Sequence, residues 1–157
     1  MRFCQRIMLV QKIILTSGFF VVLGFIVIPA MAADRYVDHG DGTVTDIKTG
    51  LMWAATDNGN SINWKDARSY CQNYGGGGHT DWRMPNLDEL ASLYDSKIKN
   101  KHGYHVNKLI DITAQSFWAS ETRGFKAARF NFTYGQTYWL RQSFSGPSRV
   151  LPVQSSK

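Results

Sequence analysis

Short apolar stretches separated by turn-forming residues open the domain and predict β-structure. Residues 43–45 and 51–54 are two such stretches, and their spacing predicts a β-hairpin within residues 36–54. The adjoining segments 38–42 and 46–50 are rich in Asp and Gly, which tolerate the left-handed backbone conformations that tight turns need.

The apolar positions then recur at three- and four-residue steps, which predicts a helix with one buried face. These positions are Trp64, Ala67, Tyr70, Cys71 and Tyr74. Asn63 stands directly before them, where a helix N-cap is expected. We expect the glycine run 75–78 to end the helix, because a glycine past the last turn readily adopts the left-handed capping conformation.

A second helix is predicted after Pro85. Asn86 occupies its N-cap position, and Glu89 three residues later completes the spacing of a capping box. The residues expected on its inner face are Leu87, Leu90, Ala91 and Tyr94. The following segment, residues 96–111, is basic and has no regular period, so we expect an irregular loop.

The remaining chain predicts antiparallel β-structure. Residues 117–120 read as a short strand, and residues 126–133 alternate apolar and polar side chains with the period of a half-buried strand. After a turn at Tyr134 and Gly135, residues 136–142 return as the hairpin partner.

A last strand is predicted over residues 149–153, in which Pro152 indicates a sheet edge or a strand end. The chain shows no internal repeat and no heptad pattern. Two helices followed by antiparallel strands, with an N-terminal β-hairpin, predict an α+β fold.

The segment before these elements is typical of a secretory signal peptide. Residues 1–12 contain three basic residues and no acid, residues 13–28 are almost entirely apolar, and an Ala-Met-Ala sequence follows. We expect cleavage after Ala32, which assigns residues 1–32 to the signal peptide and residues 33–157 to a single domain.

An uncleaved membrane anchor is the alternative. The apolar stretch of residues 13–28 is shorter than the roughly 20 residues that a bilayer core requires, which favours cleavage. No cysteine follows the cleavage site, which argues against a lipoprotein anchor, and no later segment is long and apolar enough to span a membrane. We expect an exported product, in the periplasm, outside the cell or at the cell surface.

The charge balance depends on this signal peptide. The whole chain has a formal net charge of +6, but three of its 18 basic residues lie within residues 1–32. The remaining basic residues exceed the 12 acids by only three. This balance argues against a nucleic-acid-binding protein, which normally carries a strongly basic surface.

The number of cysteines indicates that the domain is stabilised by its hydrophobic core and not by disulfides. Cys4 falls within the signal peptide, so the exported domain has Cys71 alone and cannot form an internal disulfide. Aromatic side chains bury large apolar areas. The tryptophans available for the core are Trp53, Trp64, Trp82, Trp118 and Trp139.

A series of motifs runs along the domain. It consists of Asp-Gly-Thr-Val-Thr-Asp at 41–46, Thr-Gly-Leu-Met-Trp at 49–53, Trp-Lys-Asp-Ala at 64–67 with Tyr70 and Cys71, Asp-Trp-Arg-Met-Pro-Asn at 81–86 with Glu89 and Leu90, and Phe-Trp-Ala-Ser at 117–120. Together these motifs resemble the C-terminal domain of bacterial collagen-like adhesins, the Lcl C-terminal domain. The resemblance covers residues 36–153 and implies a domain of adhesion type.

Residues 83–90 also resemble the Arg-Leu-Pro-Thr-x-x-Glu segment of formylglycine-generating and related C-type-lectin-like domains. This second resemblance implies a C-type-lectin-like mixed fold, with two helices packed on antiparallel sheet. Members of the adhesin family commonly carry a cysteine in the last strand that pairs with the cysteine of the first helix. Leu151 stands at the candidate position, so the resemblance implies that Cys71 lacks this partner.

We interpret the motif side chains as structural. Trp82 supplies a large apolar body, and Arg83 beside it is expected to bond backbone carbonyls that the loop leaves unpaired. The full set of expected structural residues is Trp53, Trp64, Trp82, Arg83, Pro85, Glu89 and Trp118.

We expect neither a metal nor a cofactor. A calcium site formed by Asp38, Asp41 and Asp46 is disfavoured, because calcium takes six to eight oxygen ligands and the regular EF-hand spacing is absent. The sugar-binding triplets of calcium-dependent lectins are absent as well. A zinc site is disfavoured because only His102 and His105 have a ligand-like spacing.

Catalysis by Cys71, with His39, His79, His102 or His105 as the base, is disfavoured too. The thiol lies on the buried face of a predicted helix, where cysteines are usually inert. The formylglycine-generating relatives depend on a pair of cysteines, which a single cysteine cannot reproduce. We therefore do not expect an enzyme.

Positive charge is concentrated in the predicted loop 96–111. In an extended conformation, alternate lysines there would point to one side and form a ladder of ammonium groups for sulfated or carboxylated polysaccharides. A solvated loop without a ligand is the alternative interpretation. The predicted hairpin 126–142 adds two arginines, and its aromatic residues are suited to stack on sugar rings. The candidate ligand-binding residues are Lys97, Lys99, Lys101, Lys108, Arg129 and Arg141.

These features favour an exported, non-enzymatic binding module of adhesion type. The partner would be an anionic polysaccharide, or a protein of the cell envelope or of a host surface. Two alternatives stay open: a periplasmic structural or assembly protein without a small ligand, and an enzyme built on a lectin-like scaffold.

Overall fold

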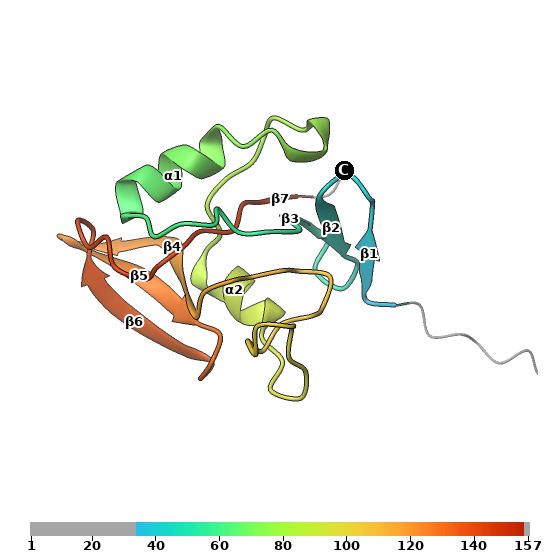
Figure 1. The fold of residues 1–157 in the computed structure, drawn as a ribbon. Helices are drawn as coiled ribbons and strands as arrows, with labels where there is room; N and C mark the ends of the chain where they lie inside the picture. The colour runs from blue at the N-terminus through green and yellow to red at the C-terminus, as the bar shows by residue number, and fades with distance from the viewer. Residues whose placement is uncertain (1–33, 156–157) are drawn as a thin grey trace, which may run out of the picture. The chain divides into compact units, whose positions relative to one another are not determined.

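The computed structural model describes residues 34–155, so the predicted signal peptide and its cleavage site lie outside the described residues. Residues 34–155 contain two α-helices, one short 3₁₀ helix and two antiparallel sheets, which confirms the α+β fold (Figure 1). The elements are β1 (Tyr36–Asp38), β2 (Thr43–Asp46), β3 (Leu51–Ala54), α1 (Trp64–Gln72), η1 (Gly76–Gly78), α2 (Leu87–Leu93), β4 (Ser116–Arg123), β5 (Lys126–Asn131), β6 (Gln136–Arg141) and β7 (Val153–Ser155). In this range no helix is long and apolar enough to cross a bilayer.

The N-terminal sheet contains the predicted hairpin. Strands β2 and β3 pair antiparallel, with Val44 opposite Trp53, and the strand order is β1-β2-β3-β7. Strand β1 pairs with the outer side of β2 and extends to Asp38, the first residue of the expected turn.

The last strand begins later than predicted. Strand β7 starts at Val153 and pairs with β3. Proline has no N–H to donate, so Pro152 ends the irregular segment and the ladder starts at the next residue. Before Pro152, Arg149 N donates to Ser116 O (3.0 Å), and Trp118 N donates to Arg149 O (2.9 Å). The C-terminal segment therefore joins the two sheets (Figure 1).

The second sheet has the order β4-β5-β6 and consists of two hairpins. The pairing of β5 with β6 agrees with the prediction. Strand β4 continues beyond its predicted end to Arg123, because a register shift between Trp118 and Thr122 accommodates the extra length. Gly124 and Phe125 form the turn into β5, and Gly124 has a φ of 55°, which glycine adopts without steric penalty.

Helix α1 begins as predicted, because the Asn63 side chain accepts a hydrogen bond from Asp66 N (3.0 Å). The expected glycine cap is wrong, since the helix ends at Gln72 and Asn73 follows as its C-cap. Asn73 Nδ2 donates to Ser69 O at 2.9 Å. This bond satisfies a carbonyl at the helix end without a glycine.

The glycine run forms the separate turn η1. Gly77 has a φ of 62°, and a Cβ at this position would lie 2.8 Å from Thr43 Cγ2 of β2. Glycine is required there by both the backbone conformation and the close approach. The turn also presents Gly76 O, to which Trp82 Nε1 donates at 3.2 Å.

Helix α2 carries the predicted capping box. Asn86 Oδ1 accepts from Glu89 N, and the Glu89 carboxylate accepts from Asn86 N, both at 2.8 Å. The predicted inner face is only partly correct, because Leu90 and Leu93 are buried whereas Ala91 is exposed. A helix of seven residues presents one short stripe to the sheet, and residues three apart form it.

The second sheet separates two hydrophobic clusters. Successive residues of a strand point to opposite faces, so Phe117 and Ala119 of β4 face the cluster of α2, while Trp118 faces the cluster of α1. The two helices therefore cover opposite faces of this sheet (Figure 1). The α1 cluster contains Ala67, Cys71, Met84, Trp118, Ala127 and Val150.

Three of the tryptophans predicted to be structural, Trp53, Trp64 and Trp118, lie in or against these clusters, and the fourth, Trp82, packs edge-on against Tyr74. Trp53 is fully buried in the larger one. Trp64 Nε1 donates to Ala119 O, and Trp118 Nε1 donates to Ile62 O, each at 2.8 Å. Both indoles thereby fix loop or strand carbonyls while their rings pack in the core.

Arg83 binds a carboxylate rather than the backbone carbonyls that were expected. Its Nη1 and Nη2 donate to the two Glu89 oxygens at 2.8 and 2.6 Å, whereas its contact with Met84 O is 3.5 Å long. The backbone of Arg83 exchanges two hydrogen bonds with Val153 of β7. The motif, which includes the buried Pro85, thus joins the start of α2 to the C-terminal strand.

Cys71 has a free thiol and is fully buried. Burial raises the pKa of this thiol to about 12. Val150 lies in the same hydrophobic cluster as Cys71, whereas Leu151 lies in the other cluster. The C-terminal residue that accompanies Cys71 is therefore Val150, and not the Leu151 expected from the resemblance.

Candidate ligand-binding surfaces

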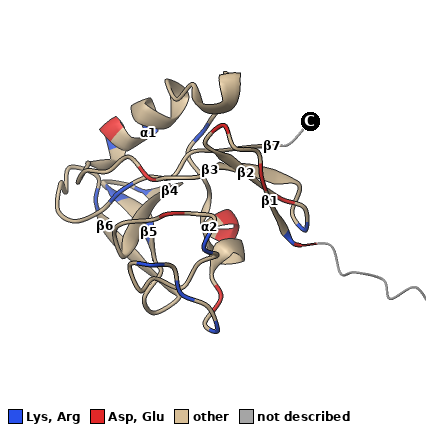
Figure 2. Ribbon diagram, turned by 45° about the vertical axis from the view of Figure 1, so that its right-hand side comes forward, with Lys and Arg blue, Asp and Glu red and all other residues tan. Residues whose placement is uncertain are grey.

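The basic loop lies between α2 and β4 and consists of turns. Lys97 N donates to Asp95 Oδ1 at 2.9 Å and Ile98 N donates to Asp95 O at 3.2 Å, which folds the start of the loop back on itself. Lys97, Lys99 and Lys101 therefore do not form the one-sided ladder expected of an extended segment. In Figure 2 the basic positions of this loop lie apart from those of β4, β5 and β6.

Asn100 holds the centre of the loop. Its side chain is buried, and Nδ2 donates to Ile112 O at 2.8 Å. Its Oδ1 accepts from His102 N at 3.0 Å and from Tyr104 N at 3.1 Å. One amide group therefore bonds through both its nitrogen and its oxygen and ties both sides of the loop together.

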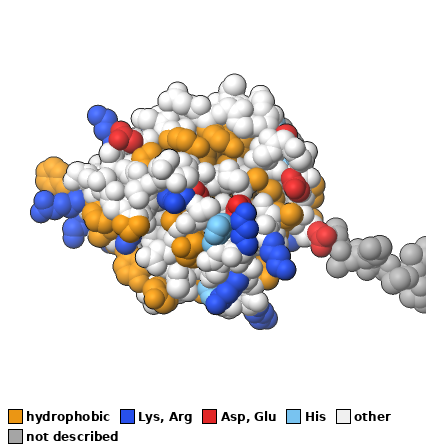
Figure 3. Space-filling model, viewed as in Figure 1, with side chains coloured by type: hydrophobic (Ala, Val, Ile, Leu, Met, Phe, Trp, Pro, Cys, Tyr) orange, Lys and Arg blue, Asp and Glu red, His pale blue; other side chains and the backbone are white. Residues whose placement is uncertain are grey.

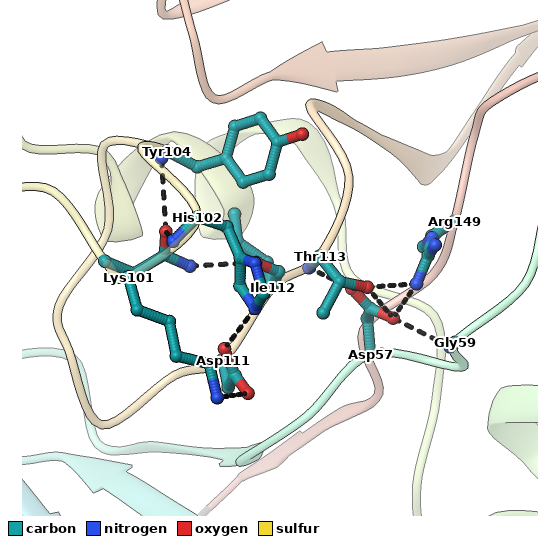
Figure 4. A network of polar contacts seen from close by, with 10 residues as sticks. Asp57, Gly59, Lys101, His102, Tyr104, Asp111, Ile112, Thr113 and Arg149 are labelled. Carbon is teal, nitrogen blue, oxygen red and sulfur yellow. Dashed lines mark hydrogen bonds and ion pairs between the residues drawn. The ribbon is translucent and has the colours of Figure 1, made fainter.

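Asp57 holds the end of the loop. Its carboxylate accepts from Thr113 N at 2.5 Å, from Gly59 N at 2.7 Å and from Arg149 Nη1 at 2.8 Å (Figure 4). Arg149 also donates to the Thr113 hydroxyl. A buried carboxylate is stable when it is paired and fully hydrogen-bonded, and this one joins three segments that are distant in sequence.

Asp111 supplies an acidic group within the basic loop. Its carboxylate lies 2.8 Å from Lys101 Nζ and 3.2 Å from His102 Nε2 (Figure 4). Its backbone N–H donates to Ala55 O at 2.7 Å, so the residue is fixed to the segment after β3. The acid partly neutralises Lys101 and fixes the direction of the lysine side chain.

Three of the four candidate lysines line one hollow. Lys99, Lys101 and Lys108 surround a hollow of about 400 Å³ together with Asn100 and Asp111. Lys97 does not line it. In Figure 3, blue and pale-blue side chains gather on the lower part of the visible face, over this loop. The turns thus bring together lysines that an extended chain would have spread out.

The two histidines of the loop point to different partners. His102 faces Asp111, whereas His105 Nδ1 lies 3.0 Å from Ile98 O and its ring packs against Tyr94. Within residues 34–155 there is no group of three or more His, Cys, Asp or Glu side chains arranged to hold a metal ion.

The aspartates of the N-terminal sheet form local bonds. Asp38 accepts from Gly40 N and Asp41 accepts from Thr43 N, at 2.9 and 3.0 Å. Asp46 accepts from Arg35 Nε and Nη2 at 2.8 and 2.6 Å. These carboxylates close turns through local backbone bonds, and Asp46 also pairs with an arginine.

The two candidate arginines lie on opposite faces of the second sheet. Arg129 is opposite Tyr138, is partly buried and donates to Ser148 Oγ at 2.9 Å. Its burial lowers the pKa of the guanidinium. Arg141 is opposite Lys126 and shares its face. Lys126 and Arg129 are three residues apart on β5 and therefore point to opposite faces, so Arg141 lies on the face away from Arg129. The six candidate residues therefore do not form a single site.

A second basic surface contains two residues that the sequence did not single out. Arg123, Lys126 and Arg141 line a hollow of about 690 Å³ at one end of the second sheet, beside Phe125. Arg123 and Lys126 flank a two-residue turn, so recognising the hairpin 116–131 with its register would have found this pair. The third member depends on the register of β6 against β5.

Two features of the predicted hairpin have different surroundings. Tyr134 and Tyr138 are exposed, whereas Trp139 is half-buried with the Arg123 guanidinium 4.0 Å from its ring centre. Asn131, which begins an Asn-Phe-Thr sequence, is buried and its Oδ1 accepts from Thr133 N at 2.8 Å. Its Nδ2 donates to Ser116 Oγ at 3.3 Å, so both ends of the amide are bonded within the domain.

The described elements define a small α+β domain with basic surfaces at two places. The chain belongs to the Lcl C-terminal domain family, whose model matches residues 42–154. This range includes both helices, the basic loop and the hairpins of the second sheet, and it confirms the family inferred from the motifs. No curated protein is similar enough to the chain to be matched with it.

Proposed function

We propose that this protein is an exported, non-enzymatic binding module that recognises anionic polysaccharide. The proposal rests on the convergence of Lys99, Lys101 and Lys108 on one hollow. Exposed ammonium groups act as compact charges with rotatable donors, so they suit sulfate or carboxylate groups at variable positions along a polymer.

The ion pair in the hollow is compatible with ligand exchange. The Lys101 side chain is 69 % exposed and that of Asp111 is 29 % exposed. Exposed ion pairs contribute little stability, so a sulfate group competes for the Lys101 ammonium at a small energetic penalty. The bonds of Asn100 and Asp57 hold the loop in place before binding, which reduces the entropy lost on association.

Two further features support a non-enzymatic exported module. The family is associated with exported proteins, in agreement with the predicted signal peptide. Cys71 is buried with the pKa of its thiol raised to about 12 by that burial, and a neutral, buried thiol is a poor nucleophile.

Heparin-column chromatography tests the proposal. The variant Lys99→Gln/Lys101→Gln/Lys108→Gln should elute at clearly lower salt than wild type, because each lost charge weakens an attraction that salt screens. The control Lys48→Gln/Lys65→Gln/Lys97→Gln removes the same number of exposed charges outside the hollow. It should elute close to wild type.

Equal losses in the two variants would show that net charge alone governs retention and would overturn the proposed site. Wild-type elution of the first variant, with its circular dichroism spectrum unchanged, would do the same. Chromatography at several salt concentrations distinguishes a weak site from no site, since the attraction fades as the Debye length falls from about 10 Å at 0.1 M to about 3 Å at 1 M.

A further inference from the structure

Three basic residues form a row across the second sheet. Arg123 is directly opposite Lys126, and Lys126 is directly opposite Arg141. Opposite side chains share a face with their Cβ atoms roughly 5 Å apart, and like charges at such positions destabilise a sheet. No acidic side chain of residues 34–155 forms an ion pair with the row. The row therefore concentrates positive charge at a cost in folding stability.

A hydrophobic side chain projects from the end of this row. Phe125 occupies the turn between β4 and β5, and it is 90 % exposed. The other large hydrophobic side chains that are exposed in the described chain range from 37 % to 64 %. Figure 3 shows a hydrophobic projection beside blue side chains at the left-hand edge of the molecule, the end at which β4 and β5 meet in Figure 1. Leaving a phenylalanine in water forgoes a large burial free energy.

The turn that carries Phe125 is held in place. Gln142 N donates to Phe125 O at 2.9 Å, and Gln142 Nε2 donates to Gly124 O at 3.0 Å. The Arg123 guanidinium lies 4.0 Å from the ring centre of Trp139, which favours its orientation on this face through a cation–π contact. The projecting ring and its flanking charges are thus arranged before any partner binds.

We propose that Phe125 and the Arg123–Lys126–Arg141 row dock the protein onto an anionic phospholipid bilayer. The phenyl ring would enter the boundary between headgroups and acyl chains, and the three cations would lie against lipid phosphates. A bilayer provides both negative charge and an apolar interior, and its fluid surface accepts a projecting phenyl ring without a preformed pocket. A polysaccharide provides no apolar interior, and a protein partner would need a matching pocket with an acidic rim.

This inference is independent of the proposed polysaccharide site. The lysine hollow and the row share no residue, so variants can remove one and keep the other. The heparin result on Lys99, Lys101 and Lys108 therefore stands or falls without affecting the bilayer inference.

Vesicle co-sedimentation tests the inference. The protein is used as purified after export, in the same form for every variant, with vesicles of phosphatidylcholine alone or mixed with phosphatidylglycerol. Wild type should bind the anionic vesicles more strongly than the neutral ones. Phe125→Ser should weaken this binding by roughly tenfold or more, and each cation removed should weaken it by roughly fivefold.

The matched controls alter equivalent groups elsewhere. Ile47→Ser changes another exposed hydrophobic residue, 51 % exposed in the first sheet's turn, and the triple lysine variant of the hollow removes the same charge as Arg123→Gln/Lys126→Gln/Arg141→Gln. Both controls should bind anionic vesicles like wild type. Near-ultraviolet circular dichroism verifies the fold of each variant, which is expected to persist because Phe125 lies outside the core.

Three results would overturn the inference. The first is equal binding of wild type to neutral and anionic vesicles, and the second is wild-type binding by Phe125→Ser. The third is an equal loss in the row variant and in the lysine-hollow variant, since this would reduce the effect to net charge. If Phe125→Ser binds vesicles like wild type but no longer binds a protein that wild type binds, the second result applies. Phe125 would then be assigned to a pocket of that protein.

Discussion

Asp57 and Arg149 lie 92 positions apart in the chain, and Asp57 Oδ1 is 2.8 Å from Arg149 Nη1. The Asp57 side chain is 1 % exposed and that of Arg149 is 20 % exposed. Thr113, at the end of the basic loop, donates to the same carboxylate through its backbone N–H and its hydroxyl. The position of the lysine hollow thus depends on residues that do not line it.

Replacing Asp57 should therefore strongly destabilise the domain. Asp57→Ala leaves the Arg149 guanidinium and the Thr113 N–H without their carboxylate, and breaking a buried ion pair from one side typically lowers the free energy of unfolding by about 3–5 kcal/mol. Asp81→Ala, at an exposed position, should change it by less than about 0.5 kcal/mol. Urea denaturation measures both, and similar midpoints for the two variants would contradict the role of this pair.

Trp82 should be essential for stability. Its side chain is 3 % exposed, and its ring meets Tyr74 edge-on with 5.0 Å between ring centres. Trp82→Ala should lower the free energy of unfolding by about 3–5 kcal/mol, as large aromatic truncations in cores do. Tyr134→Ala, at a position 64 % exposed, is the control. A wild-type denaturation curve for Trp82→Ala would refute a structural role.

Arg83 should matter less than the sequence suggests, and Glu89 more. The Arg83 side chain is 44 % exposed, so Arg83→Ala should lower the free energy of unfolding by less than about 1 kcal/mol. Glu89 also accepts from Asn86 N in the capping box, so Glu89→Ala should remove about 1 kcal/mol more. Thermal and urea denaturation show which variant is less stable. A larger loss for Arg83→Ala than for Glu89→Ala would contradict this prediction.

Asp46 should make stability depend on pH under acidic conditions. Burial alone would raise the pKa of its carboxyl, but hydrogen bonds from Arg35 and Thr49, with the charge of Arg35, outweigh burial and lower it. Such a group contributes stability that is complete above its unfolded pKa and is lost as pH falls through its folded pKa.

The melting temperature of wild type should accordingly fall more steeply below about pH 4 than that of Asp46→Asn. Above that pH the difference between the two proteins should be constant. Parallel curves over the whole acidic range would show that the Asp46 carboxyl keeps an ordinary pKa.

The Cys71 thiol should be unreactive in the native protein. Burial raises its pKa to about 12, so almost no thiolate forms at pH 8, and reagents cannot reach it. Titration with a thiol reagent should show little reaction in buffer and one reactive group per domain after denaturation. Rapid labelling of the native protein, or a disulfide-linked dimer, would contradict a buried thiol.

The elements that the sequence predicted well depend on neighbouring residues. Asn63 and Asn86 cap helices whose first N–H groups lie two or three residues away, and Glu89 completes a box within one turn. The hairpins are equally local, because a short turn fixes the register of the strands on either side. The predictions fail where contacts outside the local sequence decide the outcome. The sheet beneath α2 sets which residues of this helix are buried. Arg83 binds a carboxylate instead of the expected backbone carbonyls.

The sequence by itself determined the family, the two helices with their N-caps, the main hairpins and the accumulation of lysine in one loop. Only the tertiary structure decided which charges meet. Asn100 and Asp57 fold the loop so that Lys99, Lys101 and Lys108 converge, and the pairing of three strands aligns a row of cations beside Phe125. Local propensities act over a few residues, whereas the position of a long side chain is set by register, burial and bonds between segments that meet only when the whole domain folds.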